Sequence, residues 1–318
     1  MKGFFKRNFR EFSVIIAIVL MCVIFTVLNP IYMQPSNIMD ILDQATIYGL
    51  MGLGIMFPII TAGIDISVGS VLAMSGCVVA KLAVAGTPAV LCMIAGLLVG
   101  LLAGAFNGFL IWKMKLQPFI ATMGTQSLFR GIAYILTDGY PVLGVPDSYR
   151  AILNTKIIGD IRLSAFVFIL WAVVVYVILK MTKFGTYVYA IGGNVEASRL
   201  SGVQVEKVSI IAYAIGMLGT ALAALVQIAK LGTGDPTTGN GWEMNAIAAA
   251  AIGGTSMAGG RGNPWGTVLG AILFSGLKIG LVVMNVSTYY QYVATGLVII
   301  VAAYVEIAQS ALTARKKK

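Results

Sequence analysis

The side chains able to do chemistry in this chain of 318 residues are few, and they stand far apart in the sequence. There is no histidine, and the three cysteines (Cys22, Cys77 and Cys92) each lie in an apolar stretch, where packing is their default role. A catalytic triad or a proton relay built on histidine is therefore excluded. We expect neither a catalytic site nor a metal site in this chain.

The first polar break in an otherwise apolar pattern is TAGIDISVGS, which contains Asp65, Ser67 and Gly69. Asp65 and Ser67 can accept the free backbone N–H groups at the start of the next helix, which would make them a helix cap. An irregular segment with a carboxylate can also line a water-filled pathway, because lipid does not tolerate exposed backbone polar groups. The two roles are compatible, and both stay open.

The second break, residues 184–207, is long and amphipathic. Asn194 can cap a short helix on which Glu196 and Arg199 lie three residues apart, and therefore on one face. Glycines flank that helix, with Gly202 on its far side. A short helix with a cap and flanking glycines is typical of a docking element for a partner protein. The alternative is a plain solvated connector.

The third break follows Leu231 and includes AIAAAAIGGTSMAGGRGNPWG. Its small residues suit either tight helix packing or a moving gate. The stretch is not a phosphate loop, because GGRG lacks the lysine and the hydroxyl residue of GxxxxGK[ST]. From the first and third breaks we assign six residues to a candidate translocation pathway. They are Asp65, Ser67, Gly69, Asn245, Thr255 and Ser256.

Two isolated cations, Arg130 and Lys278, fall inside apolar segments. Each is close enough to the outer end of its segment for its charged head to snorkel to the membrane interface, which is the interpretation we prefer. The alternative is that they face a polar cavity inside the protein.

Apolar segments must position these residues, because hydrophobic residues make up 58% of the chain and charged residues only 11%, with a mean hydropathy of +0.91. About 20 residues rising 1.5 Å each cross a hydrocarbon core about 30 Å thick. We therefore predict an all-α membrane protein, a single domain over 1–318 with about ten transmembrane helices. The eighth segment is short enough to be a partial span or a helix packed inside the protein. The predicted spans are Phe12–Leu28, Thr46–Thr61, Ser67–Ala85, Pro88–Trp112, Pro118–Thr137, Leu163–Lys180, Val208–Ala229, Met244–Ala258, Trp265–Met284 and Tyr289–Ala308.

The basic residues predict the orientation, since cytoplasmic loops carry an excess of Lys and Arg. With ten crossings, most of the 22 basic residues fall on the side of both termini. We therefore expect cytoplasmic ends at 1–11 and 309–318 and a cytoplasmic loop at 184–207. The same asymmetry accounts for the net charge of +10 without a nucleic-acid partner. The basic start followed by an apolar stretch resembles a secretory signal, but no small-x-small site follows, so we expect an uncleaved first helix.

Glycines at four-residue spacing predict close helix packing in two segments, Pro88–Trp112 and Trp265–Met284. Each segment is followed by a short loop and a span that opens with aromatic residues. If spans one to five correspond to spans six to ten, the odd number of crossings makes the second half upside down, as in many transporters. Two inverted five-helix halves are therefore expected, with generic close packing as the alternative.

Three stretches in the right order resemble signature stretches of the carbohydrate-importing ABC permeases of the ribose, xylose and galactoside type. They are GIDISVGSVLAMSG (63–76), IGGNVEASRLSGV (191–203) and NAIAAAAIGGTSMAGGRG (245–262). The similarity covers residues 40 to 308, and AIGGN…RLSG and STYYQYV favour the ribose branch. Two departures are Ile66, where the family usually has Leu, and Asn245, where Asp is common; the second puts any charged role at this position in doubt.

The resemblance implies a ten-helix subunit of the bacterial cytoplasmic (inner) membrane that pairs with a second copy or a close relative. It also implies cytoplasmic ATP-binding subunits, which use ATP and Mg²⁺, and an extracytoplasmic sugar-binding protein, with no cofactor in this chain. The coupling helix that docks on the ATPase would then carry Asn194, Glu196, Ala197, Arg199 and Gly202.

The function expected from the sequence is the import of a monosaccharide, ribose or a similar sugar, by a permease without its own ATPase motif. The alternative is an ion-coupled secondary transporter of a small polar solute. That class places carboxylates within its spans, and this chain offers only Asp65 and, near its end, Glu306. A membrane-embedded enzyme has almost no candidate residues. Dependence of transport on an added ATPase or on an ion gradient separates the first two classes.

Overall fold

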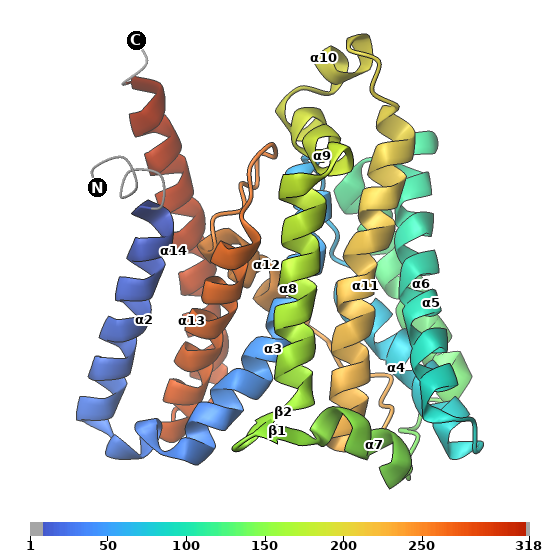
Figure 1. The fold of residues 1–318 in the computed structure, drawn as a ribbon, viewed down its shortest axis with the longest axis vertical. Helices are drawn as coiled ribbons and strands as arrows, with labels where there is room; N and C mark the ends of the chain where they lie inside the picture. Colours follow the sequence, from blue (N-terminus) through green and yellow to red (C-terminus); the bar gives the residue numbers. More distant parts are fainter. Residues whose placement is uncertain (1–8, 316–318) are drawn as a thin grey trace.

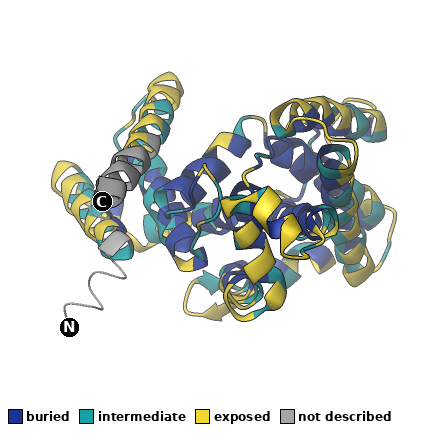
Figure 2. Cartoon of the chain, turned by 90° about the horizontal axis from the view of Figure 1, so that it is seen from above, coloured by how far each residue is buried: buried dark blue, intermediate teal, exposed yellow. Residues whose placement is uncertain are grey.

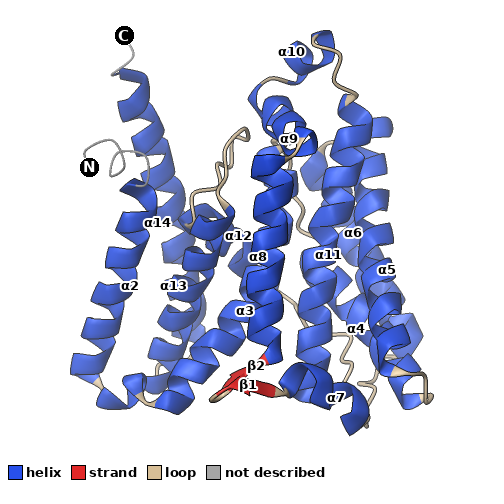
Figure 3. Cartoon of the chain, in the orientation of Figure 1, coloured by secondary structure: helices blue, strands red, loops and turns tan. Residues whose placement is uncertain are grey.

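The computed structural model describes residues 9–315 and is almost entirely helical (Figure 1). Of the predicted basic ends, residues 1–8 and 316–318 lie outside the described part. A two-stranded antiparallel hairpin, β1 (Lys156–Ile158) and β2 (Ile161–Arg162), is the sheet within that part (Figure 3). The α-helices are α2 (Phe9–Leu28), α3 (Pro35–Ile60), α4 (Val68–Val84), α5 (Ala89–Gly108), α6 (Pro118–Thr137), α7 (Asp147–Asn154), α8 (Leu163–Met181), α9 (Lys183–Gly193), α10 (Val195–Leu200), α11 (Val205–Leu231), α12 (Trp242–Ile252), α13 (Pro264–Val283) and α14 (Thr288–Arg315), with single turns η1 (Pro30–Met33) and η2 (Phe109–Lys113).

Ten of these helices occupy the ten predicted apolar segments, so the prediction of an all-α membrane protein is confirmed. The main boundary difference is α3, which begins at Pro35, well before the predicted start at Thr46. Among the described residues, six helices are long and apolar enough to cross a membrane, namely α2, α3, α5 with η2, α8, α11 and α13. The helices that were not expected as spans, α7, α9 and α10, are short and lie at the two ends of the molecule (Figure 1).

Helix α12 does not reach across a membrane. Its 11 residues rise roughly 16 Å, about half of a 30 Å hydrocarbon core. Its residues from Asn245 to Ala251 are all buried, which agrees with the prediction of a partial span packed inside protein. The alanines of this helix leave no bulky side chain to hold neighbours apart, so other helices approach closely on several sides.

The core of the fold is formed by α3 and α11, which other helices surround. The apolar stretch of α3 is 89% buried and that of α11 is 72% buried, whereas that of α2 is 11% buried. Figure 2 shows the buried residues at the centre and the exposed ones on the peripheral helices. Peripheral side chains such as Val27, Leu102 and Ile135 are apolar although they are exposed. In water such a surface would drive aggregation, and in a bilayer it faces lipid.

The two ends of the molecule differ in the elements that they carry. Helix α10 lies at one end, together with the start of α2 and the end of α14, and we call this the inner end after the predicted orientation (Figure 1). Helix α7 and the β1–β2 hairpin lie at the opposite, outer end. The described parts of the two predicted cytoplasmic ends and the predicted cytoplasmic loop thus lie at the same end of the molecule. That this end faces the cytoplasm remains a prediction.

The two halves repeat along the chain, and two of the matching helix pairs begin at the same spacing. Helices α3 and α11 begin at Pro35 and Val205, and helices α6 and α14 begin at Pro118 and Thr288, so both pairs are 170 positions apart. Matching helices run in opposite directions (Figure 1). Their packing also matches: α5 on α11 corresponds to α13 on α3, and α4 on α6 corresponds to α12 on α14. The inverted repeat thus holds for four helices of each half.

The first helix of each half departs from this symmetry. Helix α2 packs on α13, whereas its counterpart α8 packs on α3. These two helices occupy positions that the repeat does not relate, and α8 is followed by α9 and α10, which have no counterpart in the first half.

The predicted glycine stripes are close-packing surfaces. A Cβ built on Gly104 of α5 would lie 2.3 Å from the backbone oxygen of Tyr213 in α11. A Cβ on Gly270 of α13 would lie 2.2 Å from the backbone oxygen of Ala249 in α12. Because backbone atoms cannot rotate away as the end of a side chain can, any larger residue must push the two helices apart.

We therefore expect Gly104→Ala to lower the thermal stability of the detergent-solubilised protein, by about 1–3 kcal/mol for an overpacked contact. Gly124→Ala on α6 is the matched control, because its Cβ would meet nothing within 4 Å and alanine favours a helix over glycine by roughly 1 kcal/mol. Equal melting temperatures for the two variants would contradict the packing assignment.

Candidate functional site

Asp65 is fully buried in the unwound segment between α3 and α4, and its carboxylate accepts three hydrogen bonds. Oδ1 accepts hydrogen bonds from the backbone N–H and the hydroxyl of Ser67, at 2.9 and 2.7 Å. Oδ2 accepts from the Nδ2 group of Asn107 in α5, at 2.8 Å. The carboxylate therefore closes a turn that leads into α4 and ties this turn to α5, and Ser67 makes no side-chain cap of its own.

The same turn occurs in the second half at the matching spacing of 170 positions. Asp235 Oδ1 accepts from the backbone N–H and the hydroxyl of Thr237, at 2.7 Å each. Asp65, Ser67 and Gly69 thus correspond to Asp235, Thr237 and Gly239, which share the pattern D-x-[ST]-x-G. Such turns are a normal use of aspartate before a change of chain direction. The first turn leads directly into α4 and the second leads into α12.

The two turns meet inside the bundle, glycine against glycine. A Cβ on Gly69 would lie 2.2 Å from the backbone oxygen of Gly239, and a Cβ on Gly239 would lie 2.6 Å from the backbone oxygen of Gly69. Gly239 also has φ +77°, a conformation that favours glycine. Neither position therefore tolerates a side chain without moving the other turn.

Polar groups from α6 and α12 surround this contact. Arg130 Nη1 donates to the carbonyl oxygens of Pro236 and Thr238, the second at 2.8 Å. Glu243, which is buried, accepts from Gln126 Nε2 at 3.4 Å. Our preferred interpretation of Arg130 as a snorkelling cation is therefore wrong. Its guanidinium supplies the donors that the carbonyls of the unwound segment before α12 would otherwise lack.

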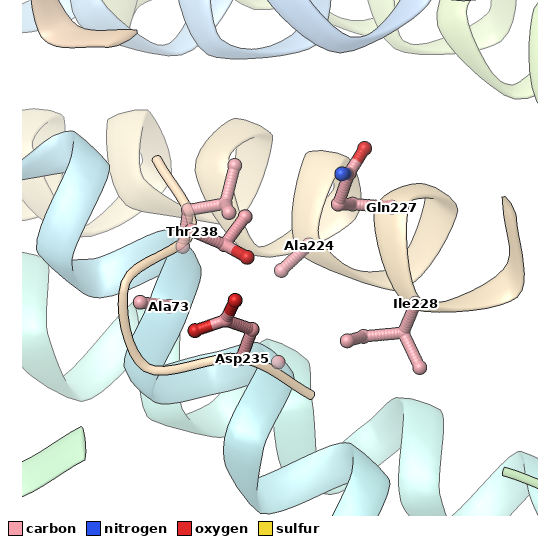
Figure 4. A pocket seen from close by; sticks show the side chains of 8 residues that line it. Ala73, Ala224, Gln227, Ile228, Asp235 and Thr238 are labelled. Carbon is pink, nitrogen blue, oxygen red and sulfur yellow. The ribbon is translucent and has the colours of Figure 1, made fainter. Parts of the chain in front are cut away.

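A narrow space beside the second turn is not a substrate site. Asp235 and Thr238 lie between α4 and α11, next to Ala73, Ala224 and Gln227 (Figure 4). The space is too small to hold a water molecule, so a sugar ring cannot enter it.

A larger cavity of about 480 Å³ lies among α12, α13 and α14. Asn245, one of the predicted pathway residues, lines it, and so does Lys278. Lys278 Nζ donates to the hydroxyl of Tyr48 at 3.1 Å, so this lysine faces the cavity instead of snorkelling. The alternative that the sequence left open, a cation facing a polar cavity, fits Lys278.

The structure does not bring the six predicted pathway residues together. Asp65, Ser67 and Gly69 form the first turn, and Asn245 lines the cavity on the far side of α12 from Glu243. Thr255 and Ser256 lie in the loop 253–263, which reaches the inner end, where the Gly260 N–H donates to the Ile60 oxygen at 2.8 Å. Their role in translocation remains a prediction.

The predicted docking helix is α10, and its geometry follows the expected caps. Asn194 accepts from the Ala197 N–H at 2.9 Å, and Gly202 has φ +82° after the last turn. Arg199 donates to Glu196 and, through Nη2, to Glu206 of α11, each at 3.2 Å. Arg199 therefore links the surface of α10 to the start of α11.

Sequence reasoning missed Asn107, Asp235, Gly239, Glu243 and Leu200. The second D-x-[ST]-x-G was detectable in the sequence, because it repeats the first one 170 positions later. Nothing in the local sequence pointed to Asn107, whose partner Asp65 is 42 positions away. The docking residues expected from the sequence were polar or small, so Leu200, which is 89% exposed at the tip of α10, was passed over.

Removing the aspartate carboxylate should lower the stability of the protein more in the first turn, at Asp65, than in the second, at Asp235. Asp65→Ala leaves the buried donors of Ser67 and Asn107 without an acceptor, which costs about 1–3 kcal/mol for each stranded group. Asp65→Asn keeps an acceptor for Ser67 and should retain much of the yield and the uptake. Asp235→Ala is the matched comparison, because Asp235 is partly exposed and water can replace it. Purified yield and uptake of the three variants test this order. Normal yield with no uptake for Asp65→Asn would instead assign its charge to the pathway.

The comparisons with known proteins identify the family. Residues 37–303 match the family described as "Branched-chain amino acid transport system / permease component". The chain is 39% identical to the ribose import permease protein RbsC of Bacillus subtilis over 96% of both chains. It is 36% identical to the D-allose transport system permease protein AlsC of Escherichia coli, over 94% of this chain and 92% of that one. It is 33% identical to the xylose transport system permease protein XylH of Escherichia coli, over 96% of this chain and 94% of that one.

No solved structure matches the chain significantly. The family match spans nearly all of the helical bundle, from α3 into α14, and includes both D-x-[ST]-x-G turns and α10. The chain therefore belongs to this family of transport-system permease components, and its resemblance to the carbohydrate-importing ABC permeases of the ribose branch is confirmed.

Proposed function

We propose that this chain is the membrane-spanning permease subunit of an ABC importer that carries a monosaccharide, ribose or a similar sugar, across the bacterial cytoplasmic membrane. ATP and Mg²⁺ are used by separate cytoplasmic subunits, and a second copy or a close relative completes the membrane unit. The observation that carries this proposal is α10, a short capped helix at the inner end with its tip exposed. Relatives named for ribose, allose and xylose transport support the substrate class.

The exposed surface of α10 suits docking on a partner. Leu200 is 89% exposed at its end, and the side chain of Glu196 is 73% exposed. A large apolar side chain that is exposed in one subunit can become buried in a pocket of its partner, and a few such buried anchors carry most of the binding energy of an interface. The Arg199–Glu206 ion pair joins α10 to the start of α11, so α10 is linked to the bundle by this contact as well as by the chain on either side.

A second path leads from the inner end toward the middle of the bundle. Gly192 of α9 packs against the end of α3, since a Cβ there would overlap the backbone of Ile60. The hydroxyl of Tyr189 donates to the Gly262 oxygen at 2.8 Å, which joins α9 to the loop that follows α12. Movement of α9 and α10 by ATPase subunits would therefore shift α12, whose N-terminus lies at the contact between the two turns.

The outer end offers a charged surface for a sugar-binding protein. A hollow of about 430 Å³ is open to solvent there and contains both acidic and basic side chains. Asp43 is paired with Arg162 and with Lys230, the latter at 3.3 Å. The lining residues are Asp40, Asp43, Arg150, Asn154, Lys156, Arg162 and Lys230.

The ion-coupled alternative is weakened by the state of Asp65. Three of the roughly four lone-pair sites of the Asp65 carboxylate already accept hydrogen bonds from Ser67 and Asn107. A sodium ion, which needs several oxygen ligands, would find at most one lone pair of Asp65 unused.

We expect Leu200→Ser and Glu196→Lys each to weaken co-purification of the ATPase subunits by about tenfold or more, as for loss of an interface anchor. Neither residue supports the core, so the melting temperature of the permease should stay unchanged. Leu143→Ser is the control, because Leu143 is 67% exposed in the loop between α6 and α7. Arg199 is a poorer test, since its substitution also frees Glu206.

Full ATPase recovery with both variants would contradict the docking assignment. ATP-driven uptake of labelled ribose by the reconstituted complex tests the function itself. Uptake that persists without the ATPase and follows a sodium or proton gradient would favour the secondary transporter.

A further inference from the structure

The cavity of about 480 Å³ is built from elements of the second half. Its walls come from the start of α12 with the two residues before it, from α13 and from the first half of α14. These parts lie toward the outer end (Figure 1). The lining residues are Asn240, Gly241, Trp242, Met244, Asn245, Lys278, Thr288, Gln291, Tyr292, Thr295, Gly296, Ile299 and Ile300.

One polar side chain in this lining is buried and has no protein partner. Asn245 is 5% exposed, and its amide makes no hydrogen bond to any described residue. An amide both donates and accepts, so its burial without a partner costs free energy unless a solute or water supplies one. Gln291 donates through Nε2 to the Val286 oxygen at 2.9 Å, which leaves its Oε1 as an acceptor on the same wall.

Aromatic rings form another part of the lining. Trp242 and Tyr292 both face the cavity. Trp242 is held edge-on against Tyr48, with ring centroids 5.6 Å apart. A ring fixed in this way offers a flat apolar face, and amides and hydroxyls nearby offer donors and acceptors. Ligand sites are generally built from such apolar walls with a few placed polar groups.

The charge of the lining is positive. Lys278 lies with Nζ 3.1 Å from the Tyr48 hydroxyl and 5.1 Å from the centre of its ring. None of the described lining residues is acidic. Glu243, the nearest acid in the sequence of α12, instead contacts Gln126 and approaches Gly69 on the other side. A fixed cation with no lining carboxylate raises the energy of any second cation that enters.

We propose that this cavity is a transit site for one uncharged, polyhydroxylated ring and that Lys278 keeps inorganic cations out of it. The proposal rests on the proposed function and specifies how the route admits a sugar without leaking ions. Asn245 and Gln291 bind ring hydroxyls, and Trp242 covers an apolar ring face. A neutral solute is attracted by these dipoles and is not repelled by the charge of Lys278, whereas K⁺ or Na⁺ is repelled by it.

The test uses the complete complex, permease with its ATPase and sugar-binding subunits, in proteoliposomes. Labelled D-ribose, D-allose and D-xylose report ATP-driven uptake, and a voltage-sensitive dye under a K⁺ gradient reports cation leak. Asn245→Leu keeps the size of the side chain and removes its amide. Lys278→Met keeps the length of the side chain and removes its charge. Lys180→Met is the control, because Lys180 also lies over a tyrosine ring, 4.4 Å from the centre of Tyr189, but on α8 away from the cavity.

Asn245→Leu should lower sugar uptake about tenfold, the order expected for one lost hydrogen bond to the solute. Its melting temperature should not fall, because the substitution removes a buried group that has no protein partner. Lys278→Met should keep sugar uptake and gain a K⁺ leak that wild type and Lys180→Met lack. Unchanged uptake in Asn245→Leu, or a K⁺-tight Lys278→Met, would overturn this inference while wild-type uptake still upholds the proposed function. Absence of uptake by the wild-type complex with all three sugars would instead reject the proposed function and the inference with it.

Discussion

The fold depends on a backbone-to-backbone contact between Gly69, in the first turn of α4, and Gly239, in the unwound segment before α12. The backbone of Gly69 fills the space that a side chain at position 239 would need, and the backbone of Gly239 fills the space that a side chain at position 69 would need. Unwound backbone is costly in lipid, so each turn needs its own donors and acceptors at this depth. Asp65 and Asp235 supply them locally, and Arg130 supplies them for the segment before α12.

This contact explains why the halves are inverted around it. Helices α4 and α12 both begin there and run toward opposite ends of the molecule (Figure 1). Helix α5 packs on α11 through its glycines, and α13 packs on α3, so these four helices form a frame around the two starts. A change at the inner end can therefore act on α12 through the loop 253–263, while the frame stays in place. The cavity beside α12 lies where such a shift would alter its shape.

Much of this architecture could be predicted from the sequence, and the rest could not, for physical reasons. Apolar length and glycine spacing are local signals, so the ten segments and the packing stripes were predictable. The partners of buried polar groups depend on the tertiary fold, and the sequence does not mark Asn107 as the donor for Asp65. Snorkelling was the wrong expectation for Arg130 and Lys278, because depth along a helix does not say which side of it faces protein. Asn245 was predicted as a pathway residue. The cavity that it lines could not be predicted, because α14, which is distant in the sequence, forms one of its walls.

The most direct test of this account is the melting temperature of Gly69→Ala, compared with Gly76→Ala on the same helix. A Cβ at position 69 would lie 2.2 Å from the backbone of Gly239 and 2.8 Å from the Glu243 carboxylate. At position 76 it would meet the flexible end of Ile228, at 3.1 Å. We predict that Gly69→Ala destabilises the protein severely, and that Gly76→Ala changes its melting temperature little. Equal and near-native melting temperatures for both variants would contradict the claim that the halves are locked at this contact.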